Sequence, residues 1–142
     1  MKSKAFLPLM EQILMIAVFA LAAALCLQGF ATADSISRNR QNKDYAVIAA
    51  QNAAERVKLL RGDMQAAAEP LSGVLDGNTV TVIYSENGTP AKFGEEEAFR
   101  IVIEKKESST PLLEYAEIRA ISGGEVIFEL TVGWQKGAGN EN

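Results

Sequence analysis

Residues 6–30 read FLPLMEQILMIAVFALAAALCLQGF, and this run decides the fold. It is apolar throughout except at four positions, which are Glu11, Gln12, Gln28 and Gly29. About 20 apolar residues in a helix are enough to cross the hydrocarbon core of a bilayer, and only a helix satisfies its own backbone polar groups there. The sequence therefore predicts a transmembrane helix over residues 6–33, after a short basic leader over residues 1–5.

The pattern changes after Ala33 from uniformly apolar to amphipathic. Apolar side chains now recur at intervals of three and four residues, a helical spacing, at Ala46, Ala50, Ala53, Val57, Leu60 and Met64. The small alanines would let a sheet or another helix approach closely, whereas the larger members of this packing stripe suit an ordinary core. Gly62 is a suitable stop signal. The sequence predicts an amphipathic helical extension over residues 34–62.

Beyond the helix the apolar period becomes two, which is typical of β-strands. We expect a transitional helix or loop over residues 63–78, and an antiparallel sheet domain with a frayed tail over residues 79–142. Asn87-Gly88 is a strong turn signal. The clearest strands are residues 79–84, 98–105, 115–121 and 125–134, and the last two form a hairpin around Ser122-Gly123-Gly124.

The last of these strands is expected to contribute one fully apolar face to the core. Five apolar side chains alternate along it, namely Val126, Phe128, Leu130, Val132 and Trp134. The predicted fold class is therefore α+β. A long N-terminal helix, transmembrane in its first half and amphipathic in its second, packs on a small antiparallel β-sheet of about four strands.

The composition argues against catalysis, metal binding and nucleic-acid binding. The 142 residues carry a net charge of −4, and no basic patch with interleaved aromatic residues is present. The chain has no histidine, which removes the commonest general base and the commonest metal ligand. No Ser/His/Asp set, metal-spaced cluster or glycine-rich phosphate loop occurs. We therefore predict no catalytic residues, no metal, no cofactor and no enzymatic activity.

The N-terminal pattern resembles that of type IV pilins and type II secretion pseudopilins. Lys4-Ala5-Phe6 matches the region of the family's peptidase cut, and Glu11 matches its carboxylate at the start of the apolar helix. Residues 45–55 are similar to the second half of that helix in minor pseudopilins, especially the I-type subunit. The sheet that ends in Val132-Gly133-Trp134 fits the same plan.

The resemblance implies processing between Ala5 and Phe6 by a prepilin peptidase, and pairing of Glu11 with the terminal amine of a neighbouring subunit. Two positions depart from the family. Ala5 stands where glycine is usual, and Glu11 lies one place later from Phe6. Two outcomes stay open, which are a processed filament subunit and an uncleaved membrane relative that primes or regulates assembly.

The resemblance also implies partners and a location. The partners are other pilin-like subunits, membrane lipid, the peptidase and the assembly platform of a secretion or pilus system. The implied location is the cell membrane, crossed once, with the N-terminus cytoplasmic and the C-terminal domain outside. Lysine and arginine counts on the two sides of the span nearly tie, so orientation rests on the resemblance.

The alternative interpretation is a signal peptide in front of an exported binding or structural domain. Ala31-Thr32-Ala33 is a fair site for signal peptidase, and the apolar run is at the upper length limit for such a peptide. The segment before it argues against this interpretation, because it is apolar and contains Glu11. The amphipathic stripe would also lose the rod to which it belongs.

Overall fold

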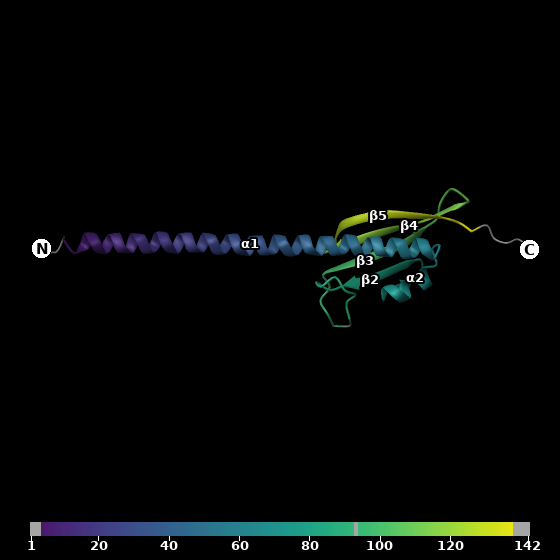
Figure 1. The fold of residues 1–142 in the computed structure, drawn as a ribbon, viewed down its shortest axis with the longest axis horizontal. Coiled ribbons are helices and arrows are strands. Elements are labelled where there is room, and N and C mark those ends of the chain that lie inside the picture. Colours follow the sequence, from purple (N-terminus) through teal and green to yellow (C-terminus); the bar gives the residue numbers. More distant parts are fainter. Residues whose placement is uncertain (1–3, 93, 138–142) are drawn as a thin grey trace, which may run out of the picture. The chain divides into compact units, whose positions relative to one another are not determined.

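The computed structural model describes residues 4–92 and 94–137, so most of the predicted basic leader and the end of the C-terminal tail, whose fraying was an expectation, lie outside the described residues. A helix, α1, runs from Phe6 to Leu59, and a short helix, α2, from Met64 to Leu71. A five-stranded antiparallel sheet follows (Figure 1). The α+β class and the long N-terminal helix are confirmed. The chain divides into two compact units between Asn39 and Arg40, and the second holds the sheet.

The sheet is a simple meander in which every strand pairs with its neighbours in the sequence. Its members are β1 (Val74–Asp76), β2 (Thr79–Tyr84), β3 (Phe99–Lys106), β4 (Leu113–Ser122) and β5 (Glu125–Gln135). There is one strand more than expected, because β1 lies in the segment predicted as helix or loop. β1 is only three residues long and fully exposed, so it carries no alternation that a pattern could reveal.

The second half of α1 covers one face of the sheet and forms the core with it (Figure 1). Its buried residues are Ala46, Ala49, Ala50, Ala53 and Val57. The buried sheet residues that share this core are Val80, Val82, Tyr84, Phe99, Ile101, Ile103, Ala116, Ile118, Ala120 and Trp134. Four of the five helical positions are alanine. The small residues of the predicted stripe therefore serve the internal core.

Helix α1 ends at Leu59, three residues before the predicted end at Gly62. The N–H of Gly62 donates to the Val57 carbonyl at 2.9 Å, and the N–H of Arg61 donates to Lys58 at 3.2 Å. These two hydrogen bonds form a Schellman motif, in which Arg61 occupies the left-handed position at a φ of 49°. Gly62 follows it at a φ of 76° and lies directly under the indole of Trp134. The chain then turns into α2.

Helix α2 occupies the middle of the transitional segment. The side chain of Asp63 accepts a hydrogen bond from the N–H of Ala66 at 3.0 Å and so caps the first turn. Pro70 lies inside the last turn, and the helix ends at Leu71, one residue after the proline. Met64 is buried on this second helix. It therefore does not belong to the apolar face of α1, although its position in the sequence continues that spacing.

The hairpin of β4 and β5 is confirmed, with a two-residue turn at Gly123-Gly124. Both glycines have positive φ, 59° and 85°, which suits the type I′ turn that matches the twist of a hairpin. A bulge at Ile127 then interrupts the register, since Ala120 pairs with Phe128 whereas Ile121 pairs with Val126. The prediction of one apolar face along the whole strand is therefore wrong at Val126, which is 51% exposed.

Candidate functional site

The first half of α1 is not covered by any of the residues that the structure describes. Every residue from Lys4 to Gln41 is exposed, including Phe19 at 77% and Phe30 at 76%. The helix has one segment that is long and apolar enough to cross a membrane, and none of that segment is buried against the rest of the chain. A helix that is apolar all round needs either lipid or other helices around it. The region is a candidate membrane anchor or signal sequence.

The residues expected at the processing and assembly sites lie at the start of this helix. Ala5 precedes the first helical residue, Phe6, which is 60% exposed. Glu11 is exposed on the helix about one and a half turns further on, which corresponds to about 7–8 Å along the axis. The structure places Phe6 and Glu11 in the first two turns of α1, with Ala5 in the turn just before the helix.

The residues of the packing stripe are buried, whereas an assembly surface would need them to be exposed. Ala46, Ala50 and Val57 are fully buried, and Ala53 is 1% exposed. Leu60 is partly buried and packs against the same core. Sequence reasoning missed Ala49, which is also buried. Its signal was available, since a helical face includes positions three and four apart, and Ala49 lies three from Ala46.

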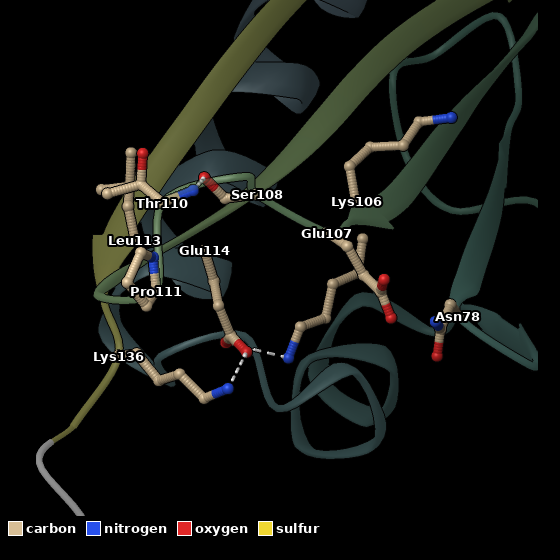
Figure 2. A pocket seen from close by; sticks show the side chains of 10 residues that line it. Asn78, Lys106, Glu107, Ser108, Thr110, Pro111, Leu113, Glu114 and Lys136 are labelled. Atoms are coloured by element: carbon tan, nitrogen blue, oxygen red, sulfur yellow. Dashed lines mark hydrogen bonds and ion pairs between the residues drawn. The ribbon is translucent and has the colours of Figure 1, made fainter.

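A polar depression lies at one end of the sheet, where the loop after β3 meets the end of β5 (Figure 2). Its volume is about 430 Å³. The lining residues are polar or charged for the most part: Asn78, Lys105, Lys106, Glu107, Ser108, Thr110, Pro111, Leu113, Glu114 and Lys136. Figure 2 shows that Lys136 points toward the carboxylate of Glu114, whereas Lys106 points away from it.

Glu114 is the centre of this depression. Its Oε2 accepts a hydrogen bond from Trp134 Nε1 at 3.1 Å and forms an ion pair with Lys105 Nζ, also at 3.1 Å. Lys136 Nζ lies 3.9 Å from its other oxygen. The hydrogen bond from Lys105, that from Trp134 and the charges of both lysines lower the pKa of Glu114, against the opposing effect of burial. The Glu114 carboxylate thus neutralises the charges of Lys105 and Lys136 and holds the Trp134 indole in place.

A second charged group lies on the face of the sheet that points away from α1. Glu104 accepts from Lys106 at 2.5 Å and from Arg119 at 2.9 Å, and Glu117 lies 3.9 Å from Lys106. The hydrogen bond from Lys106 lowers the pKa of Glu104. The register places the carboxylates of Glu104 and Glu117 opposite each other, and Lys106 and Arg119 neutralise them from neighbouring positions. Neither charged group combines a nucleophile with a base.

We expect the variant Glu114→Gln to lose only a little stability at neutral pH, at most about 1 kcal/mol, because the ion pairs are partly exposed. The amide can still accept from Trp134. Since the pKa of Glu114 is lower in the folded chain than its ordinary value of 4.5, the charged form stabilises the fold above that pH. Urea unfolding at a series of pH values should show the difference between variant and wild type shrink as pH falls from about 4.5 through the lower folded pKa of Glu114. A difference that does not shrink below pH 4.5 would contradict the ion-pair account.

No protein-family model, curated protein or solved structure matches this chain.

Proposed function

We propose that this protein is a pilin-like or pseudopilin-like structural subunit, anchored in the membrane by the first half of α1. It would assemble by lateral helix packing into a type IV pilus or type II secretion pseudopilus, or prime that assembly. One observation carries the proposal. A single helix, α1, is apolar and exposed on all sides over residues 6–30, and is buried on one side against a sheet over residues 46–57. The residue pattern around Ala5, Phe6 and Glu11 supports it.

The proposed mechanism depends on what covers the apolar surface of residues 6–30. In a membrane the lipid surrounds residues 6–30, so subunits can be stored there, with the N-terminus cytoplasmic and the sheet outside. In a filament the same surface would be covered by the corresponding helices of neighbouring subunits. Without a strong hydrophobic drive between helices in lipid, such packing depends on close contact and on polar pairs. Glu11, which is a costly residue within an apolar segment, would supply the polar pair.

We expect Glu11→Ala to leave membrane insertion intact and to reduce incorporation into assemblies about tenfold. Removal of one carboxylate makes the segment more apolar, whereas the loss of the charge pair removes what sets the stagger between subunits. A photo-activated cross-linker in place of the exposed Phe19 measures incorporation in the native membrane. Gln12→Ala is the matched control, since it removes a neighbouring polar side chain without a charge. Equal cross-linking by Glu11→Ala and wild type would remove Glu11 from the mechanism.

The alternative function is an exported domain that signal peptidase releases after Ala33. It gains support from the division of the chain, because every buried residue lies in the unit that begins at Arg40. Cleavage after Ala33 would therefore leave the core, including the packing stripe from Ala46 onward, complete. The N-terminus of the mature protein decides between the two. A start at Phe6, or an intact leader on membrane-bound protein, supports the anchored subunit, and a soluble chain that starts at Asp34 supports release.

A further inference from the structure

The two edges of the sheet are very different. β1 forms one edge with three residues, whereas β5 forms the other with eleven. An edge strand presents unpaired N–H and C=O groups, and proteins commonly protect such edges with proline, lysine or short length. Between Glu125 and Gln135 there is no proline and no basic residue. The only protective features of β5 are its bulge and its two glutamates.

The hydrogen-bonding pattern shows which backbone groups of β5 have no partner among residues 4–92 and 94–137. The N–H of Lys136 donates to the Leu112 carbonyl at 2.9 Å, which makes these two residues a hydrogen-bonded pair. In an antiparallel ladder such pairs alternate with pairs whose backbone groups point away from each other. Four residues therefore direct their N–H and C=O groups away from β4, and all four are exposed: Glu129, Thr131, Gly133 and Gln135.

The side chains beside this edge indicate what would cover it. On the side of α1, Phe128, Leu130 and Val132 are only partly buried, so they have apolar surface left at the open edge. On the other side Glu129 is exposed, and Arg119 opposite it already binds Glu104 at 2.9 Å. A row of alternating donors and acceptors is satisfied by one kind of group, an extended backbone.

We propose that the β5 edge, defined as the outward backbone groups of residues 129–135, binds an extended segment of another protein. That segment adds a sixth strand. Its apolar side chains cover Phe128, Leu130 and Val132, and basic side chains on its other face meet Glu129. A second copy of β5 is the poorer occupant, because it would bring two further carboxylates and no cation. The inference does not depend on how the chain is anchored.

The first experiment uses the full chain in zwitterionic detergent micelles and a nine-residue peptide that alternates lysine and valine. Hydrogen exchange is followed at each amide of β5. In the free chain the amides of residues 129, 131, 133 and 135 should exchange fast, while those of the ladder residues between them are protected. At saturating peptide the four outward amides should slow at least tenfold. A glutamate–valine peptide of the same length should give no such protection.

The second experiment compares Thr131→Pro with Thr131→Val. The proline removes an outward N–H without a loss in the β4 ladder, a position where edge strands tolerate it. The valine keeps the N–H and the branched shape. We expect Thr131→Pro to bind the lysine–valine peptide at least tenfold more weakly and Thr131→Val to bind it as wild type does. Unchanged Trp134 fluorescence and unchanged protection of the ladder amides show that the fold is retained.

Two results would overturn the proposal. The first is equal peptide affinity of Thr131→Pro and Thr131→Val, since the backbone edge would then not be the binding site. The second is protection of the four outward amides in the free chain that grows with protein concentration. That result would assign the edge to a second copy of this protein and not to a basic partner segment.

Discussion

Replacement of Ala50 with aspartate is expected to remove most of the stability of the sheet-containing unit. Ala50 has no exposed surface and lies at the centre of the alanine stripe that α1 presses on the sheet. Buried carboxyls without a partner have pKa values raised by as much as 3–5 units, and because pH 7 lies about 3 units above the unfolded pKa, the cost at neutral pH is about 4 kcal/mol. Domains of this size are stable by about 5–15 kcal/mol. Urea unfolding of the full chain in micelles, followed by the fluorescence of Trp134, measures the loss.

The pH dependence separates the charge from the extra volume. The folded pKa of the new carboxyl lies above its unfolded value, so the folded state holds more protons and the deficit grows as pH rises from about 4. Ala50→Asn has nearly the same shape and should show a deficit that does not change with pH. Gln51→Asp, on the exposed side of the same turn, should stay within about 0.5 kcal/mol of wild type. A small, pH-independent effect of Ala50→Asp would mean that α1 does not pack tightly on the sheet.

Gly62→Ala has the second largest expected effect, a loss of about 3 kcal/mol in the free energy of unfolding. A methyl group there would overlap Cζ2 of Trp134 and lie 2.6 Å from Cε2. The side chain of Trp134 is 6% exposed and its Nε1 is bound to Glu114, so the indole has little room to move. A non-glycine residue in the left-handed region costs about 1–2 kcal/mol, and overpacking costs a further 1–3. For a unit of about 100 residues the melting temperature should fall by roughly 12–20 °C.

Gly123→Ala is the matched control for the backbone term. Gly123 also has a positive φ, 59°, but a methyl group there would meet nothing within 4 Å. Its loss should therefore be limited to about 1–2 kcal/mol. Equal losses of stability in Gly62→Ala and Gly123→Ala would show that contact with Trp134 adds no energetic cost, and that the indole is free to shift.

The features with a long, regular pattern could be predicted from the sequence. The apolar run of residues 6–30, the alanine spacing that starts at Ala46 and the turn at Gly123-Gly124 each predict an element that the structure contains. Features that depend on tertiary contact could not. β1 is held through its backbone pairs with β2, and the bulge at Ile127 turns Val126 outward although the alternation of residue types continues.

The candidate sites show the same division. Buried positions such as Ala46 and Val57 follow from helical period, so their burial was within reach of the sequence. The Glu114 cluster was not, because it joins side chains from β3, β4 and the end of β5 through distances that no spacing encodes. The free edge of β5 also needed the strand order, since a strand sequence does not state which side is paired.

The meander order has a consequence for how the protein forms. Because every strand pairs with the one before it, most sheet contacts join residues that are near in the sequence, and chains of this kind collapse quickly. The hairpins can therefore form one after another as the polypeptide is made, before its last residues arrive. Docking of the alanine stripe, which joins residues 46–57 to strands up to about 70 positions later, is the step that would limit the rate.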